Sequence, residues 1–192
     1  MNYAGIYIHI PFCAVKCMYC DFYSIADREG LIPRFTNAIA SEIEQCVVDT
    51  SDWVFDTIFI GGGTPSLLDE KYIESIFLAL HKKYDLTHLK EFTTEANPGE
   101  APIERLRDFW QLGINRLSIG VQSLEPDLLK FLTRIHSADQ VFKTYDNARS
   151  AGFDNVNCDL IYSIPGQSWE IWERDLNRVL DLDANHISAY TL

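Results

Sequence analysis

Three cysteines, Cys13, Cys17 and Cys20, lie within eight residues of one another near the start of the sequence. Their spacing, C-x-x-x-C-x-x-C, puts three thiols on one tight loop just after a short apolar run. Thiolates are the usual protein ligands of iron–sulfur clusters, and a cubane cluster has four sites to fill. The loop therefore predicts a cluster held at three corners, with the fourth iron open to a small molecule.

The same thiols allow a different metal site. With His9 as the fourth ligand they would form a Cys3His zinc site, which is a common structural centre. Five cysteines, three of them clustered, fit metal or redox use better than a disulfide framework. The residues alone leave the iron–sulfur and zinc readings open.

A glycine-rich stretch, Gly61-Gly62-Gly63-Thr64-Pro65, directly follows the apolar run 56–60. Ligands of parallel α/β folds bind at the carboxyl ends of strands, and glycines there let backbone groups approach a ligand closely. The stretch lacks the G-x-G-x-x-G spacing of a Rossmann helix, and no P-loop lysine follows it. It indicates either a ligand-binding loop or a tight turn.

Four polar residues fall at or just beyond the ends of predicted strands, namely Glu95, Gln122, Arg134 and Asp159. The two carboxylates could accept ribose hydroxyls or bind an ammonium group, and Arg134 could pair with a carboxylate. Isolated residues of these types are usually solvated, so their interest depends on the fold that gathers them.

Six segments have the composition of strands, at 5–10, 56–60, 91–97, 115–122, 155–161 and 186–191. Helices are expected between them, at 33–47, 69–84, 102–112, 126–132, 137–152 and 168–182. Strands alternating with helices indicate parallel β-α units. An eight-unit barrel takes about 250 residues, so six units predict an open, partial (β/α)6 TIM-like barrel. A doubly wound sheet is the alternative.

The predicted strands alternate between polar and apolar residues, whereas strands buried on both faces usually read as apolar runs. The apolar faces would pack on the helices and the polar faces would line the lumen. Cys46 and Cys158 fall on apolar faces, so we expect both to be buried. The polar faces carry Tyr7, His9, Thr93, Glu95, Arg116, Ser118, Asn157, Asp159, His186 and Ser188. A polar lumen costs stability, which suggests that it holds a polar ligand.

Composition limits the partners. The net charge of −12 argues against nucleic acid, which requires a basic face. No apolar run approaches the roughly 20 residues of a membrane span, and the amino terminus lacks a signal-peptide pattern, so we expect a cytoplasmic protein. The 192 residues suffice for one domain.

The cysteine loop, after Tyr-Ile-His-Ile-Pro-Phe, resembles the signature of the radical S-adenosylmethionine (SAM) enzymes. Within that superfamily the chain is similar to the oxygen-independent coproporphyrinogen III oxidase group, which includes the HemW-type heme chaperones. The resemblance covers almost the whole chain. It extends through Gly61-Gly62-Gly63-Thr64-Pro65, Glu95-Ala96-Asn97-Pro98, Asn115-Arg116-Leu117-Ser118-Ile119-Gly120-Val121-Gln122, Arg134-Ile135-His136 and Asp159-Leu160-Ile161-Tyr162.

The resemblance implies a role for each matching residue. Cys13, Cys17 and Cys20 would ligate a [4Fe-4S] cluster, and Tyr7, Gly62 and Glu95 match positions that hold the cluster-bound SAM. Further nucleotide-contacting positions are matched by Tyr19, Gly63, Thr64, Gln122, Arg134 and Asp159. Cleavage of SAM would give a 5′-deoxyadenosyl radical, with electrons from a reduced flavodoxin- or ferredoxin-type donor.

The chain departs from the oxidases, which resemble C-x-x-x-C-x-x-C-x-C, because position 22 is Phe22. Those enzymes also carry an amino-terminal arm before the first strand, and this chain begins only a few residues ahead of that strand. Both departures favour a heme chaperone that binds SAM and handles heme or porphyrin. The alternative is oxidative decarboxylation of coproporphyrinogen III, so whether the protein is an enzyme stays open. Family members continue past the sixth strand, so we expect residues 1–192 to be the radical SAM core barrel.

Overall fold

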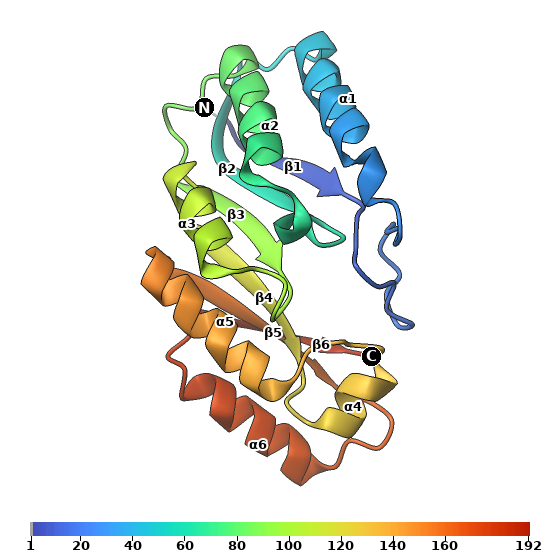
Figure 1. Cartoon of the computed structure of the whole chain (residues 1–192). Coiled ribbons are helices and arrows are strands. Elements are labelled where there is room, and N and C mark those ends of the chain that lie inside the picture. The colour runs from blue at the N-terminus through green and yellow to red at the C-terminus, as the bar shows by residue number, and fades with distance from the viewer. Residues whose placement is uncertain (1) are drawn as a thin grey trace.

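The computed structural model describes residues 2–192, which form one six-stranded parallel sheet in the order β1-β2-β3-β4-β5-β6 (Figure 1). The strands are β1 (Asn2–Ile10), β2 (Trp53–Gly62), β3 (Glu91–Ala96), β4 (Arg116–Gln122), β5 (Asn155–Tyr162) and β6 (His186–Thr191). Each strand pairs with the one before it in the sequence, so the sheet never reverses its order as a doubly wound sheet does. The open (β/α)6 barrel is confirmed.

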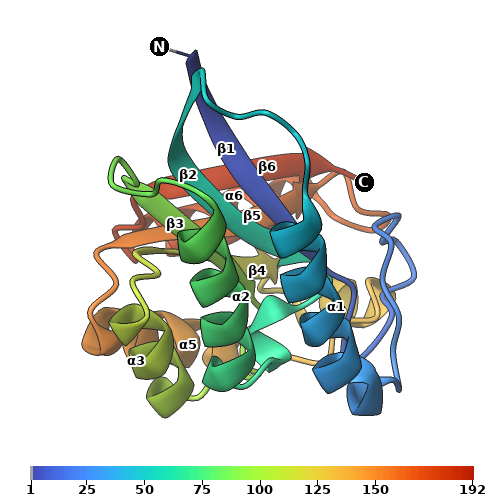
Figure 2. The same ribbon diagram turned by 90° about the horizontal axis from the view of Figure 1, so that it is seen from above.

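The helices lie outside the curved sheet, as the view in Figure 2 shows for α1, α2, α3 and α5. They are α1 (Ile32–Gln45), α2 (Glu70–Lys83), α3 (Ile103–Gln111), α4 (Pro126–Phe131), α5 (Ala138–Ala151) and α6 (Trp169–Leu180), with 3₁₀ turns η1 (Glu29–Leu31) and η2 (Pro65–Leu67). Right-handed crossovers between neighbouring parallel strands place their helices on one side of the sheet. No helix among residues 2–192 is both long enough and apolar enough to cross a membrane.

The hydrophobic core lies between the sheet and the helices. Fully buried side chains of alternate strand positions, including Ile58, Ile60 and Leu117, pack with Ile76 of α2 and Phe109 of α3 in one cluster. The spacing of two residues in a strand puts these side chains on one face. The predicted apolar faces are therefore the faces that contact the helices.

The opposite face of β4, β5 and β6 carries a network of polar side chains. The Asn157 amide donates to Ser118 Oγ and to Asp159 Oδ1, both at 2.7 Å. Ser118 donates to Asp159 at 3.1 Å, and Ser188 donates to Asn157 Oδ1 at 3.1 Å. These bonds satisfy polar groups that would otherwise be costly to bury. The polar inner face expected from the alternation is confirmed.

Two details of the helices differ in outcome. The helix expected at 137–152 is present as α5, with a capping box formed by Ser137 and Gln140 at its start and Gly152 at its end with a φ of 114°. The prediction that Cys46 is buried is wrong, because α1 ends at Gln45 and Cys46 turns out of the helix with a ψ of 123°. Val47 follows it into solvent. Cys158, in contrast, is fully buried in β5 as expected.

A buried carboxylate of α6 holds the segment between β4 and α4. Asp175, only 1% exposed, accepts hydrogen bonds from Ser123 Oγ at 2.6 Å and from Leu124 N at 2.9 Å. Arg174 donates to the same carboxylate at 2.8 Å and to Glu125 at 2.9 Å. The chain directly after β4 is therefore fixed to a helix rather than left free in solvent.

Candidate functional site

The cysteine loop lies beside α4 at the carboxyl ends of the strands, toward which the arrows point in Figure 1. Its base is closed by backbone hydrogen bonds, from Cys13 N to Ile25 O at 3.0 Å and from Ile25 N to Pro11 O at 2.8 Å. Gly63 N donates to Ile10 O at 2.7 Å, which ties the glycine-rich stretch to the start of the loop. The two motifs are therefore one structural unit.

Tyr19 anchors the middle of the loop to the barrel. Its ring packs against a small apolar cluster from α4, β5 and the segment after β5, formed by Leu128, Leu132, Ile161 and Ile164. Burial raises the pKa of Tyr19 to about 12, against the opposing effect of the Arg134 guanidinium. The loop therefore crosses the barrel mouth from β1 to the ends of β4 and β5.

All five cysteines of residues 2–192 are free thiols, and Cys13, Cys17 and Cys20 are each partly exposed. Burial raises the pKa of Cys13, and the neighbouring thiols Cys20 and Cys17 raise it further, so the three sulfurs lie within electrostatic reach. Within the described part of the chain, no three His, Cys, Asp or Glu side chains already converge on one metal-binding point. The donor set itself, three thiols on one partly exposed loop, suits an iron–sulfur cluster.

His9 is engaged at both ring nitrogens. Tyr7 Oη lies 3.0 Å from Nδ1, and the Tyr23 carbonyl oxygen lies 2.7 Å from Nε2. Because a carbonyl only accepts hydrogen bonds, Nε2 carries the proton and Nδ1 accepts from Tyr7. A zinc ion would have to displace one of these partners, which counts against the Cys3His alternative.

Glu95 and Asp159 make the inner face acidic near the mouth. Gly62 N donates to Glu95 Oε2 at 2.9 Å, which joins the ends of β2 and β3. Burial raises the pKa of Glu95 to about 7, and the charge of Asp159 raises it further, while the Gly62 bond lowers it. Burial also raises the pKa of Asp159, against its bonds to Asn157 and Ser118. Two carboxylates of high pKa suit a cationic ligand.

The backbone is strained where the candidate residues stand. Gln122 has a φ of 67° at the end of β4, and Thr133, next to Arg134, has a φ of 58°. Residues other than glycine adopt such backbone angles at a cost in free energy, and they often do so at functional sites. At Gly63, a Cβ atom would lie 2.6 Å from Phe12 O, so only glycine allows this approach to the cysteine loop.

Arg134 reaches from the segment after α4 back to the sheet. Its Nη2 donates to Asn97 Oδ1 at 2.6 Å and to Gly120 O at 2.8 Å, and its Nη1 points at Cys17 Sγ at 3.9 Å. Asn97 also donates to Thr64 Oγ1 at 2.9 Å. Sequence reasoning missed Asn97 as a site residue, although its position as a polar residue directly after the third strand was a usable signal.

The candidate residues fall into two groups. Tyr7, Gly62, Glu95 and Asp159 lie along the inner face, where the pKa of Tyr7 is raised by burial and then by the charge of Glu95, and the charge of Asp159 raises the pKa of Glu95. The other group lies in or beside the cysteine loop and consists of Tyr19, Gly63, Thr64 and Arg134, with Gln122 next to Arg134 at Gly120. In the second group, Thr64 contacts the sulfur of Cys13 and Arg134 contacts the sulfur of Cys17.

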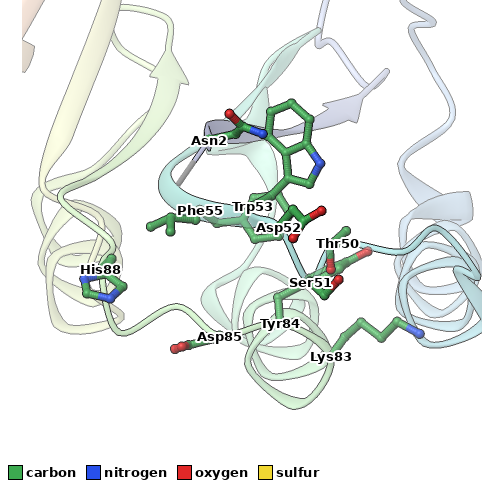
Figure 3. A pocket seen from close by; sticks show the side chains of 11 residues that line it. Asn2, Thr50, Ser51, Asp52, Trp53, Phe55, Lys83, Tyr84, Asp85 and His88 are labelled. Carbon is green, nitrogen blue, oxygen red and sulfur yellow. The ribbon is translucent and has the colours of Figure 1, made fainter.

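The structure has one cavity beside the cysteine loop and another far from it. One of about 360 Å³ is lined by Leu129, Thr133, Arg134 and His136 next to the loop. Another of about 610 Å³ lies at the amino end of β2, where Trp53, Tyr84 and His88 line it together with Asn2 (Figure 3). It is at the far end of the strands from the cysteines, so it is not part of the candidate site.

Several curated proteins are similar to this chain over nearly its whole length. The heme chaperone HemW of Bacillus subtilis (strain 168) is 38% identical over 187 residues, which are 97% of this chain and 49% of that protein. HemW of Escherichia coli (strain K12) is 37% identical over 190 residues, which cover 98% of this chain and 50% of the relative. This chain thus spans about half the length of the curated relatives it matches.

A solved structure agrees with the fold. The structure described as "Coproporphyrinogen III oxidase (HemN) from Escherichia coli is a Radical SAM enzyme" superposes with a TM-score of 0.89 at 28% identity. The superposition covers 99% of this chain and 44% of the chain in that solved structure. The family model described as "Radical SAM superfamily" matches residues 7–179, which include the cysteine loop and four of the six strands in full, β2 to β5. The chain therefore belongs to the radical SAM superfamily.

Proposed function

We propose that this chain is the radical SAM core barrel, residues 1–192, of a heme chaperone of the HemW type. The observation that carries the proposal is the similarity to HemW proteins at 34–38% identity over at least 97% of the chain. Phe22 supports it, because the resembling oxidases have a fourth cysteine at that position. Heme handling is proposed for the whole protein, because this chain spans only about half the length of its HemW relatives.

Membership of the superfamily implies a [4Fe-4S] cluster and SAM. Such a cluster, when reduced, supplies the electron that cleaves the sulfonium of SAM. We propose Cys13, Cys17 and Cys20 as its ligands, since they are three free thiols on one loop that is fixed at its base. We also propose a reduced flavodoxin- or ferredoxin-type protein as the electron donor, and a cytoplasmic location.

The inner-face group is proposed to hold the polar parts of SAM. Glu95 and Asp159 offer carboxylates for an ammonium group or ribose hydroxyls, and Tyr7 lies on the same face. Arg134 offers a guanidinium for the carboxylate of the amino acid moiety. Tyr19, Gly62, Gly63, Thr64 and Gln122 are proposed as the remaining contacts, because each stands at the loop or at a strand end. A cationic ligand would offset the repulsion between Glu95 and Asp159.

One observation favours a second function, which is the oxidative decarboxylation of two propionates of coproporphyrinogen III. The solved structure of that oxidase has the same fold with a TM-score of 0.89. Its identity to this chain, 28%, is lower than that of the HemW proteins. We therefore rank the chaperone function first.

The test is anaerobic reconstitution with iron and sulfide, followed by assay of 5′-deoxyadenosine from SAM and a heme titration of the full-length protein. We expect about four irons and four sulfides per chain, SAM-dependent product, and heme uptake. Cys17→Ala should abolish cluster assembly, whereas Cys158→Ser, which alters a cysteine buried in β5, should not.

Each outcome separates the alternatives. Stoichiometric zinc without iron or sulfide in anaerobically prepared protein would refute the cluster. A cluster-loaded full-length protein that takes up no heme would refute the chaperone function. Conversion of coproporphyrinogen III under SAM and reductant would establish the oxidase function in its place.

A further inference from the structure

Two of the three loop cysteines have hydrogen-bond donors from the barrel, and the two donors meet at one side chain. Thr64 Oγ1 donates to Cys13 Sγ at 3.6 Å. The Arg134 guanidinium donates to Cys17 Sγ at 3.9 Å. Asn97 contacts both donors, at 2.9 Å for Thr64 Oγ1 and 2.6 Å for Arg134 Nη2. A continuous path of hydrogen bonds thus runs from one thiol to the other through the carboxyl end of β3.

The partners of Asn97 fix the orientation of its amide. Arg134 is only a donor, so it requires the carbonyl oxygen, and Glu100 is only an acceptor when ionised, so it requires the amino group. Glu100 accepts from Asn97 Nδ2 at 2.8 Å, and the second hydrogen of that nitrogen goes to Thr64. Every hydrogen-bonding atom of the Asn97 side chain is therefore used.

This orientation decides what Thr64 does. Because Asn97 donates to Thr64 Oγ1, the single hydroxyl proton of Thr64 is left for Cys13 Sγ. Thr64 is only 2% exposed, so water does not compete for its hydroxyl. Its backbone N–H is bound to Phe12 O at 2.7 Å, which keeps it beside the cysteine loop.

Gly120 keeps room for the same arrangement. A Cβ atom there would lie 3.2 Å from both Asn97 Oδ1 and Arg134 Nη2. Arg134 also donates to the Gly120 carbonyl, so the guanidinium is held from two sides. The donor to Cys17 is therefore positioned by packing and hydrogen bonds of the barrel.

We propose that Asn97 is a positioning residue for the iron–sulfur cluster, aiming Thr64 at Cys13 and Arg134 at Cys17. The inference rests on the proposed function, because it requires a cluster on this loop. Partners that hydrogen-bond to metal ligands orient them and tune the metal centre. Hydrogen bonds to cluster sulfurs stabilise the more negative, reduced cluster and so raise its reduction potential.

The experiment compares Asn97→Leu with Asn115→Leu in protein reconstituted anaerobically without SAM. Asn115 is a matched control, since its amide also both accepts and donates, from Phe92 N at 2.9 Å and to Lys90 O at 2.8 Å, but at the amino ends of β3 and β4. Cluster content, the electron paramagnetic resonance spectrum of the reduced cluster and its midpoint potential are measured. Circular dichroism checks the fold.

We expect Asn97→Leu to give a more negative midpoint potential and an altered spectrum, and Asn115→Leu to match the wild type in both. Thr64→Val should shift the potential in the same direction. The double variant should shift no further than Asn97→Leu alone, because both changes break the same path. If Asn97→Leu does not fold, Asn97→Asp is used, which offers Thr64 an acceptor instead of a donor and should also lower the potential.

The outcomes separate this inference from the proposed function. A wild-type chain that takes up no iron and sulfide would overturn both. A wild-type cluster of normal content, with an Asn97 variant of unchanged potential and spectrum, would overturn the positioning role alone. Additive shifts from Asn97→Leu and Thr64→Val would also overturn it, because they would mean that Asn97 does not act through Thr64.

Discussion

Glu95 gives the chain a specific dependence of stability on pH. Burial raises the pKa of this carboxyl from its ordinary value of 4.5 to about 7 in the folded protein. The folded chain therefore keeps a proton that the unfolded chain releases, so folding becomes less favourable as the pH rises from about 4.5 to about 7. Below that pH range the carboxyl of Glu95 is protonated in both states and does not destabilise the fold. Above it, the destabilisation by the ionised carboxylate has reached its full value.

The magnitude follows from the two pKa values. Each pH unit between them corresponds to about 1.4 kcal/mol, so the ionised carboxylate of Glu95 destabilises the ligand-free fold by about 3 kcal/mol above pH 7. This value is an upper limit, because the side chain of Glu95 is partly exposed to solvent. Glu95→Gln removes the charge and keeps an oxygen to accept the hydrogen bond from Gly62 N.

The assay is urea unfolding of the ligand-free wild type and Glu95→Gln at about pH 4.5 and about pH 8. We expect nearly equal free energies of unfolding at the lower pH, and a variant more stable by about 2–3 kcal/mol at the higher pH. Glu104→Gln, at an exposed position of α3, is the control and should change little at either pH. A gain of equal size at both pH values would refute the role assigned to ionisation, and no gain at pH 8 would refute the burial argument.

Three further predictions concern other parts of the chain. Asp175→Ala leaves a buried hydroxyl and a buried N–H without their acceptor, so we expect the free energy of unfolding, measured in urea, to fall by about 3 kcal/mol. Asp175→Asn keeps an acceptor and should lower it by less. Equal losses from the two variants would contradict this reason. Cys46, whose thiol pKa is lowered by a hydrogen bond to Tyr84, should be alkylated rapidly in the native protein, whereas Cys158, whose burial raises its thiol pKa to about 12, should react only on unfolding. In the cluster-free protein, Cys17→Ala should keep the wild-type circular dichroism spectrum, since the thiol lies outside the strand and helix layers; global unfolding would contradict that placement.

The architecture could be predicted from the sequence because its signals are local. Alternation of period two in the strands, the Ser137 capping box and the glycine at 152 each depend on a few neighbouring residues, and each leads to the element found there. The end of α1 could not be predicted in the same way. Cys46 and Val47 continue the helical spacing of apolar residues, but the chain leaves the helix before them. Boundaries depend on where the chain must turn, which periodicity does not encode.

The sequence by itself determined the donor set and the side of the sheet on which it lies. Three thiols with their spacing, and polar residues at the ends of successive parallel strands, need no coordinates, since carboxyl ends of parallel strands always share one edge. Only the tertiary structure decided which of these residues meet. Asn97, Thr64 and Arg134 come from three different connections, 33 and 37 residues apart from one partner to the next, and their contact depends on side-chain packing across the mouth. The raised pKa of Glu95 has the same origin, because burial and the nearness of Asp159 arise only when β3 and β5 curve around one lumen.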